Sequence, residues 1–409
     1  MQTSLADFIR DTPEGREADA ILRKCVHCGF CLATCPTYQL LGNELDSPRG
    51  RIYLIKQVLE GGTPSEKTQL HLDRCLTCRA CEITCPSGVE YGRLADIGRG
   101  LVEARVPRSA RERLKRRLLA SIVPYTGRFR ALMVLARLAR PVLPPSLAGK
   151  VPARSPEPGA WPAAKHARKM IVLAGCVQPA LSPDINAAAA RVLDRAGISL
   201  VEAPAAGCCG ALRFHLNCQE EGRSDMRALV DAWWPLMESG VEAIVMTASG
   251  CGATVREYGH LLAQDAEYAE KAARVAAMTR DLSEIISDEW PRLEPLVERR
   301  PERVAFQSPC TLQHGQRLQG VVEGLLASAG FELTPVIDSH LCCGSAGTYS
   351  LLQPELSEEL KRNKLDALHA GAPERILTAN IGCQSHLASG ARVPVEHWVV
   401  ALERRLRGA

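Results

Sequence analysis

Two short segments rich in cysteine constrain this chain more than any other feature of its sequence. The first reads CVHCGFCLATCP from residue 25 to residue 36, and the second reads CLTCRACEITCP from residue 75 to residue 86. Each segment places three cysteines at intervals of three residues and a fourth directly before a proline. The chain holds 17 cysteines, an odd number, and such dense spacing indicates metal ligation rather than a disulfide framework.

Three evenly spaced cysteines and a fourth before proline are the pattern that two-cluster ferredoxins use for 4Fe-4S clusters. In that pattern the three cysteines curl around one cluster, and the fourth binds the neighbouring one. The sequence therefore predicts two 4Fe-4S clusters with crossed ligands. The predicted ligands are Cys25, Cys28, Cys31 and Cys85 for the first cluster, and Cys75, Cys78, Cys81 and Cys35 for the second.

Two structural zinc sites are the alternative explanation, but zinc favours paired Cys-x-x-Cys turns rather than three evenly spaced cysteines. The segment between the two motifs contains GRIYLIKQVLEGG and EKTQLHLDR, which have helical patterns. We therefore expect a helical ferredoxin domain. Clusters with four cysteine ligands offer no open position to a substrate, so this domain is predicted to relay electrons.

The chain divides by composition into four parts. Residues 1–107 form the predicted ferredoxin domain, and residues 108–168 form a basic segment that ends in a linker rich in Pro, Gly and Ala. Residues 169–300 and 301–409 are two copies of one pattern. In each copy a strand leads to a cysteine, a helix and a second strand follow, and a Cys-Cys-Gly triplet precedes a last strand and cysteine.

The spacing within the two copies is nearly the same. The first cysteine and the pair are separated by 32 residues in both, and the pair and the last cysteine by 42 and 40 residues. Alternating strands and helices predict parallel sheets, whose strand ends share one edge, where ligands bind. We expect each copy to gather four cysteines there. They are Cys176, Cys208, Cys209 and Cys251 in the first copy, and Cys310, Cys342, Cys343 and Cys383 in the second.

Four thiolates are what a 4Fe-4S cluster requires, so the copies predict one or two further clusters, with the second copy the stronger candidate. The glycine behind each Cys-Cys pair permits the sharp turn that a vicinal pair needs to serve one centre. Cys218 has no counterpart in the second copy, and we interpret it as an idle thiol.

Other features limit the location and the partners of the chain. Residues 1–24 lack an apolar stretch typical of a signal peptide, and no run of about twenty apolar residues predicts a membrane span. From Arg108 to Arg140 there are ten Lys or Arg and one acid, a pattern typical of a solvated helix but also suited to an anionic membrane surface. We find no flavin or nucleotide fingerprint and expect no nucleic-acid partner.

The motifs carry a resemblance over essentially the whole chain. The segments HLDRCLTCRACEITCPSGVEYGRL, ASGCGATVREYG and DSHLCCGSAGTYSLLQPELS, together with the first cysteine motif, closely resemble the iron-sulfur subunits of bacterial glycolate oxidases, also called glycolate dehydrogenases. The chain is similar, more distantly, to iron-sulfur subunits of anaerobic glycerol-3-phosphate dehydrogenase and to heterodisulfide reductase subunits.

The resemblance implies an oxidoreductase complex in which FAD-binding partner subunits oxidise glycolate to glyoxylate. This chain would then pass the electrons toward a quinone or another respiratory acceptor, without a flavin or a catalytic residue of its own. The resemblance also implies a cytoplasmic protein held peripherally at the inner face of the cell membrane.

Two other functions remain open at this point. The chain is also compatible with an iron-sulfur subunit of another 2-hydroxy-acid or glycerol-3-phosphate dehydrogenase, and with a catalytic subunit like heterodisulfide reductase. The heterodisulfide reductase relatives end each copy in Cys-x-x-Cys, whereas this sequence has Thr254 and His386 at those positions. Four cysteines therefore remain in each copy, and a five-cysteine site is not expected.

Overall fold

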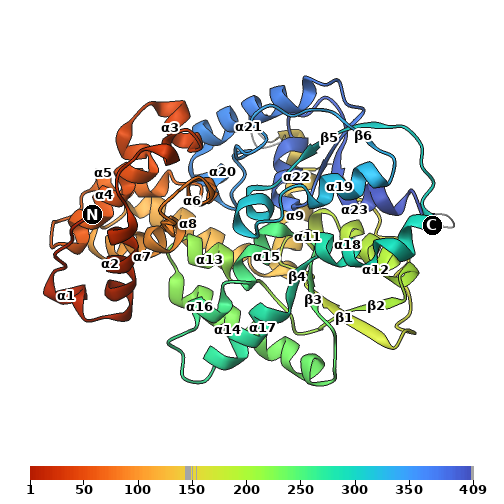
Figure 1. Cartoon of the computed structure of the whole chain (residues 1–409), viewed down its shortest axis with the longest axis horizontal. Coiled ribbons are helices and arrows are strands. Elements are labelled where there is room, and N and C mark those ends of the chain that lie inside the picture. The colour runs from red at the N-terminus through yellow and green to blue at the C-terminus, as the bar shows by residue number, and fades with distance from the viewer. Residues whose placement is uncertain (143–148, 150, 153, 407–409) are drawn as a thin grey trace. The chain divides into compact units, whose positions relative to one another are not determined.

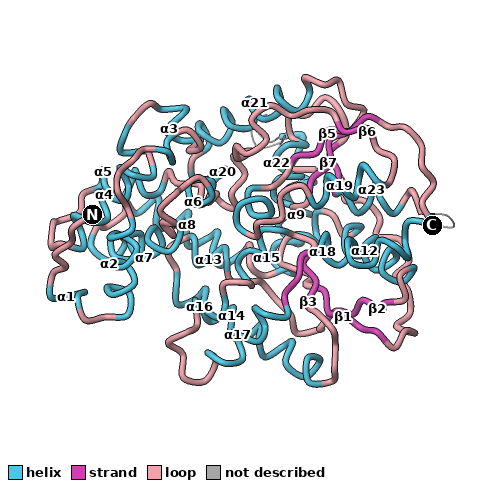
Figure 2. Tube along the Cα trace, viewed as in Figure 1, coloured by secondary structure: helices cyan, strands magenta, loops and turns pink. Residues whose placement is uncertain are grey.

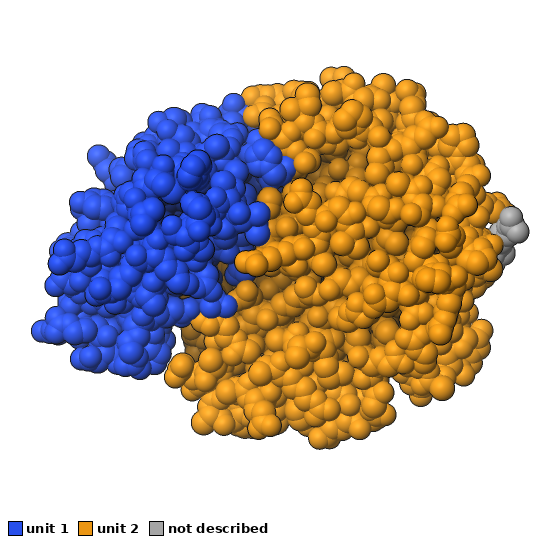
Figure 3. Space-filling view, in the orientation of Figure 1, with its two compact units in different colours: residues 1–117, 340–360 blue, residues 118–339, 361–409 orange. Residues whose placement is uncertain are grey.

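The computed structural model describes residues 1–142, 149, 151–152 and 154–406. They form two compact units (Figure 3), of which the first comprises Met1–Arg117 and His340–Leu360 and the second comprises Leu118–Ser339 and Lys361–Ala409. Part of the predicted linker, at 143–148, 150 and 153, lies outside the described residues. The domain boundaries expected near residues 107, 168 and 300 remain predictions.

Residues 1–117 contain helices and no strand, which confirms the predicted helical ferredoxin domain. The two stretches with helical patterns form α4 and α5. The helices are α1 (Asp7–Arg10), α2 (Pro13–Lys24), η1 (Phe30–Leu32), α3 (Pro36–Leu41), η2 (Glu44–Asp46), α4 (Pro48–Leu59), α5 (Glu66–Asp73), α6 (Ala80–Ile83), α7 (Tyr91–Arg105) and the first part of α8 (Ala110–Ile122).

The core of this unit lies between α2, α4 and α7. Helix α4 begins after Ser47, whose hydroxyl accepts a hydrogen bond from the Gly50 amide at 3.0 Å, with Pro48 in the first helical position. Gly98 lets α7 approach α4 closely, because a Cβ there would lie 2.6 Å from Cγ1 of Ile55. Each loop with three cysteines leaves this core from a helix end, the first after α2 and the second after α5.

Residues 340–360 belong to the same unit, although they are distant in sequence. They include α20 (Tyr349–Leu352) and the start of α21 (Pro354–His369). The Tyr349 hydroxyl donates to the Arg74 carbonyl at 3.1 Å and so fixes α20 to the end of α5. The cysteine spacing did not predict that the second Cys-Cys pair, Cys342 and Cys343, lies in this unit.

The second unit contains two four-stranded parallel sheets, which confirms the predicted α/β modules (Figures 1 and 2). The strand orders are β2-β1-β3-β4 and β6-β5-β7-β8, so both sheets share one topology. The first three strands of each sheet were predicted. The strands are β1 (Arg168–Val172), β2 (Ile198–Glu202), β3 (Ile244–Met246), β4 (Thr279–Asp281), β5 (Arg303–Gln307), β6 (Glu332–Leu333), β7 (Arg375–Thr378) and β8 (Val395–His397).

Helices cover both faces of the first sheet, as parallel sheets require. Met170 and Val172 of β1 point into a core that also contains residues of the second sheet, whereas Ile171 and Leu173 point into a separate core. Within the shared core, α12 (Asp184–Arg195) packs on α23 (Trp398–Glu403), and α18 (Leu282–Leu293) packs on α19 (Val321–Ser328). The two copies are therefore joined by a common core.

The remaining helices connect these strands. They are α9 (Thr126–Ala139), η3 (Arg140–Val142), α11 (Gln178–Leu181), α12 (Asp184–Arg195), α13 (Ala211–His215), α14 (Gln219–Glu238), α15 (Ser249–Val255), α16 (Tyr258–Leu261), α17 (Ala269–Met278), α18 (Leu282–Leu293), η4 (Glu294–Leu296), the π-helix η5 (Thr311–Gly315), α19 (Val321–Ser328), α22 (Ile381–Ala388) and α23 (Trp398–Glu403).

Among the described residues, no single helix has the length and apolar composition needed to cross a bilayer. Two consecutive helical segments, Ala110–Ile122 and Thr126–Val142, meet that criterion only when taken together, and they are bent by 112° at the break between them.

Candidate iron-sulfur sites

The two loops that carry three cysteines each have the same backbone conformation. The first loop is left-handed at His27 (φ 58°) and Gly29 (φ 87°), and the second at Thr77 (φ 54°) and Arg79 (φ 58°). These positions are equivalent in the two motifs, and left-handed backbone is uncommon for residues other than glycine. Both loops therefore bend in the same way at the same two positions.

Four cysteines from the two motifs line a single cavity in the first unit. They are Cys35, Cys75, Cys78 and Cys81. Arg51 and Tyr91 line the same cavity. This is the combination that the crossed-ligand pattern predicts for the second cluster, because Cys35 comes from the first motif and the other three from the second.

The electrostatics of this cavity favour a thiolate at Cys75. Burial raises the pKa of Cys81 well above its ordinary value, and the charges of Cys78 and Cys75 add to that effect. Burial acts in the same direction on Cys75, but the positive charges of Arg51 and Arg99 outweigh it and hold the pKa of Cys75 below its ordinary value. Since the thiolate is the form that binds metal, the two arginines prepare the cavity for a ligand.

The chemistry of the donors fits an iron-sulfur cluster. Thiolates are the ligands of Fe-S clusters, and four of them around one cavity supply the full set for a 4Fe-4S cluster. In the part of the chain that the structure describes, no group of three or more His, Cys, Asp or Glu side chains is arranged to hold a single metal ion. The four cysteines that line the cavity are therefore the observation on which the assignment of this site depends.

The thiols predicted for the first cluster contact the same helical core. Cys25 is buried, and Cys31 and Cys85 pack against the core. Burial raises the pKa of Cys31 to about 11, and the charges of Cys25 and Cys35 contribute. Cys28, in contrast, is exposed. This ligand set remains a prediction.

The first copy of the cysteine-rich pattern brings its four cysteines together in the second unit. Cys176 is hydrogen-bonded to Cys208, Cys208 to Cys209, and Cys209 to Cys251. The hydrogen bond to Cys208 and burial raise the pKa of Cys176 well above its ordinary value. Cysteines that follow β1, β2 and β3 therefore meet at the carboxyl edge of one sheet, as expected for a parallel sheet.

Gly210 makes the turn after the first Cys-Cys pair. Its φ is +81°, and a Cβ there would lie 2.5 Å from the Gly222 carbonyl oxygen. Gly344 has φ +87° after the second pair, and its Cβ would lie 2.6 Å from the Ser357 carbonyl oxygen. Both positions require glycine for conformation and for space, as the sequence suggested.

Two polar side chains support the cysteines of the first copy. The Tyr258 hydroxyl donates to the Cys209 carbonyl at 2.8 Å. Arg213 donates to Asp225 at 2.7 Å and to the Tyr125 hydroxyl at 2.7 Å, and the charge of Cys208 contributes to the raised pKa of Arg213, against the opposing effect of burial. A guanidinium therefore accompanies these thiols, as Arg51 accompanies Cys75.

The cysteines of the second copy are divided between the units. Cys342 and Cys343 belong to the first unit, and Cys310 and Cys383 to the second. The Gly344 amide donates to the Cys342 sulfur at 3.4 Å, and the Asn380 amide group donates to the Cys383 sulfur at 3.6 Å. A common site for these four cysteines remains a prediction.

The cysteine motifs did not predict that Arg51 and Arg99 lie beside these sites. Arg51 is buried in α4 in register with Leu54, Ile55 and Val58, at spacings of three, four and seven residues. Arg99 occupies a similar buried position in α7. A basic residue within an apolar stripe is the signal that would have identified them, because a buried charge needs a partner.

Comparison with known proteins identifies three regions of the chain. Residues 21–89 match the model of a 4Fe-4S dicluster domain, and residues 170–256 and 304–388 each match the model of a cysteine-rich domain. The chain thus carries a ferredoxin-type domain for two 4Fe-4S clusters and two cysteine-rich modules.

Several curated proteins are similar to the chain. It is 56% identical over 406 residues to the glycolate oxidase iron-sulfur subunit of Escherichia coli, and the match covers 99% of both chains. It is 32% identical to the probable glycolate oxidase iron-sulfur subunit of Bacillus subtilis, over 90% of this chain and 89% of that protein. Lactate utilization protein A of Geobacillus thermodenitrificans is 24% identical over 58% of this chain and 99% of its own length.

Proposed function

Because the chain belongs to the family of glycolate oxidase iron-sulfur subunits, we propose that it carries electrons from the flavin subunits of a glycolate oxidase toward a respiratory acceptor. The flavin partner oxidises glycolate to glyoxylate, and this chain is the electron-transfer part of the oxidoreductase. A quinone is the acceptor class that we favour.

The cavity lined by Cys35, Cys75, Cys78 and Cys81 is the observation that carries this proposal. Four cysteine ligands leave a 4Fe-4S cluster no open position for a substrate, so its chemistry is the uptake and release of single electrons. The protein holds the thiols in place, buries Cys35 and Cys81, and supplies the positive charge that favours a thiolate at Cys75. We assign the first cluster to Cys25, Cys28, Cys31 and Cys85, and the second to Cys75, Cys78, Cys81 and Cys35.

We further propose that Cys176, Cys208, Cys209 and Cys251 ligate an additional cluster. Their hydrogen-bonded arrangement and the neighbouring Arg213 support this assignment. We assign Cys310, Cys342, Cys343 and Cys383 to a second additional cluster, by analogy between the two copies.

Tyr349 supports an electron path from the second cluster toward the second Cys-Cys pair. Burial raises the pKa of Tyr349, the charge of Arg51 opposes this effect, and the charges of Cys75 and Cys342 add to it. Tyr349 therefore lies within electrostatic range of a cysteine from each site, all within one unit.

The division of labour between subunits gives the first test. The purified chain, with its clusters loaded, is expected not to reduce an artificial dye with glycolate, whereas the complex with its flavin partner does. Visible absorbance that bleaches with dithionite serves as the control for loaded clusters. Glycolate-dependent dye reduction by the isolated chain would show that it holds the oxidation site itself.

We also propose that α9 contacts an anionic membrane surface at the inner face of the cell membrane. Leu135 is 64% exposed and Leu138 is 75% exposed on this helix, and Arg128, Arg130 and Arg140 are exposed near them. Exposed leucines flanked by arginines are typical of helices that lie in the interface of an anionic bilayer.

Replacing both leucines of α9 tests this proposal. The double variant Leu135→Ser and Leu138→Ser is expected to bind vesicles containing phosphatidylglycerol at least tenfold more weakly, because each buried CH₂ contributes about 0.8 kcal/mol and the loss of two such groups already corresponds to that factor. Cosedimentation of the full chain with vesicles measures the binding. The control variant Leu41→Ser and Leu70→Ser makes the same change at exposed leucines of the first unit. Equal binding of both variants would refute a role for α9.

A further inference from the structure

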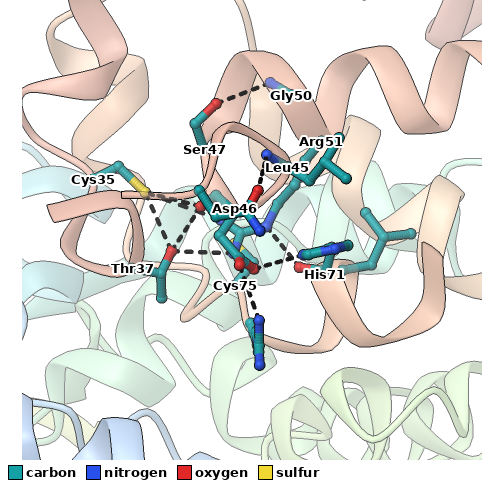
Figure 4. A network of polar contacts seen from close by, with 12 residues as sticks. Cys35, Thr37, Leu45, Asp46, Ser47, Gly50, Arg51, His71 and Cys75 are labelled. Carbon is teal, nitrogen blue, oxygen red and sulfur yellow. Dashed lines mark hydrogen bonds and ion pairs between the residues drawn. The ribbon is translucent and has the colours of Figure 1, made fainter. Parts of the chain in front are cut away.

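A buried polar network borders the cavity of the proposed second cluster (Figure 4). At its centre lie Arg51 and Asp46, whose side chains are 1% and 0% exposed. Burying a charge is unfavourable unless partners compensate it. The groups around Arg51 therefore decide how far its charge is compensated.

The guanidinium of Arg51 is held from three sides. Its Nε donates to the His71 carbonyl at 2.7 Å, and its Nη2 donates to the Thr37 hydroxyl at 3.1 Å and approaches Oδ1 of Asp46 at 3.4 Å. These contacts come from different elements, so the side chain has little freedom to move. The remaining nitrogen, Nη1, points to the Cys35 sulfur at 4.0 Å.

The carboxylate of Asp46 does not neutralise its surroundings. Its Oδ2 accepts a hydrogen bond from Nη1 of Arg74 at 3.0 Å, and its Oδ1 lies 3.0 Å from Nδ1 of His71. One carboxylate thus faces two guanidinium groups. The network therefore carries a surplus of positive charge beside the cavity, and a negative group in the cavity would compensate it.

Two further contacts join the network to the thiol of Cys35. The Thr37 hydroxyl, which donates to the Asp46 carbonyl at 2.9 Å, lies 3.4 Å from the Cys35 sulfur, and that sulfur lies 3.7 Å from the same carbonyl oxygen. Near Cys75, Arg99 donates to the Cys75 carbonyl at 2.5 Å and to the Thr77 hydroxyl at 2.9 Å. Positive charge thus borders both Cys35 and Cys75.

The first loop has a different environment. Arg49 is its neighbouring cation, since the charge of Cys31 contributes to the raised pKa of Arg49, after the larger effect of its hydrogen bond to Glu44. Arg49 is 32% exposed and bonds Glu44 at 2.6 Å, so its charge is both paired and partly solvated. Positive charge near a cluster favours its reduction, because reduction makes the cluster more negative.

We propose that Arg51, held by Asp46, Thr37 and His71, raises the reduction potential of the cluster ligated by Cys35, Cys75, Cys78 and Cys81 above that of the other N-terminal cluster. This inference rests on the proposed ligation of that cluster. Electrons are therefore directed toward the second cluster within the pair. Arg51 contacts no substrate and acts through charge and position alone.

Redox titration of the full chain, followed by electron paramagnetic resonance, tests this role. In Arg51→Gln, the ratio of reduced to oxidised second cluster at a fixed potential is expected to fall about tenfold, which corresponds to about 59 mV for one electron. Arg51→Lys retains the positive charge, so its midpoint potential is expected to lie close to that of the unmodified chain. Lys56→Gln removes a cation from the same helix that does not line the cavity, and its midpoints are expected to match those of the unmodified chain.

Arg74→Gln provides a second variant in case Arg51→Gln does not fold. The Arg74 side chain is 26% exposed, so its replacement is expected to lower the midpoint potential of the second cluster by a smaller amount than Arg51→Gln does. An unchanged midpoint in whichever variant retains its clusters would overturn the role of the arginines. If the unmodified chain showed no signal from the second cluster, the proposed ligation of that cluster would be refuted instead.

Discussion

Serine at position 35 is expected to abolish or strongly perturb the cluster at Cys75, Cys78 and Cys81, while the signal of the cluster at Cys25 remains nearly intact. The reason is the cavity, which Cys35 lines together with the three cysteines of the second motif. A serine oxygen is a poor replacement for the thiolate that an Fe-S cluster requires. Electron paramagnetic resonance of the reduced variant resolves the two signals.

The reciprocal variant supplies the matched control. Cys85→Ser changes the corresponding cysteine of the second motif, and it is expected to affect the cluster at Cys25, Cys28 and Cys31 instead. If Cys35→Ser removed only the signal of that first cluster, each motif would hold its own four cysteines and the crossed assignment would be wrong.

Local sequence patterns predicted most of the elements that position these sites. Apolar runs identified β1, β3 and β5, and the helix expected between the first two strands of the first copy is α12. The second strand expected in the second copy is short and forms only at Glu332–Leu333. The Glu332 and Thr334 amides donate to β5, so Pro335 faces the open edge of the sheet, where a missing amide hydrogen is tolerated.

The fourth strand of each sheet was not predicted. β4 and β8 are three residues long, read TRD and VEH, and lack the apolar run that marks a buried strand. They form because β3 and β7 offer a free edge for pairing, which is a tertiary effect. The common core of the two copies was missed for a similar reason, since the pattern of each copy says nothing of its neighbour.

The sequence predicted the cysteines of each site but not the charged residues around them. Spacing alone predicted which cysteines would share each site, because the ferredoxin pattern and the strand ends both have a fixed geometry. The charges around the thiols were not predictable, since Arg51 meets Cys75 only after α4 and the end of α5 pack together. The membership of Cys342 in the first unit likewise depends on contacts between residues far apart in sequence.

The thiols that meet at the edge of the first sheet lead to the second large effect. The anaerobically purified chain is expected to contain more than about eight iron atoms, the number that two 4Fe-4S clusters account for. Cys208→Ser is expected to lower the iron content by about four atoms per chain, because it removes one of four ligands of a single cluster. Iron and acid-labile sulfide analysis measures the change.

Cys218→Ser is the matched control, since it changes a cysteine of the same module that has no counterpart in the second copy and is expected to leave the iron content unchanged. Cys342→Ser applies the same measurement to the second module. Thiols gathered at a sheet edge call for a functional explanation. Gly210 and Gly344 maintain the backbone turns beside the Cys-Cys pairs, and no other residue fits these turns. If the chain held about eight iron atoms, and neither Cys208→Ser nor Cys342→Ser lowered that number, the thiols would serve the packing of the modules and electrons would leave directly from the ferredoxin domain.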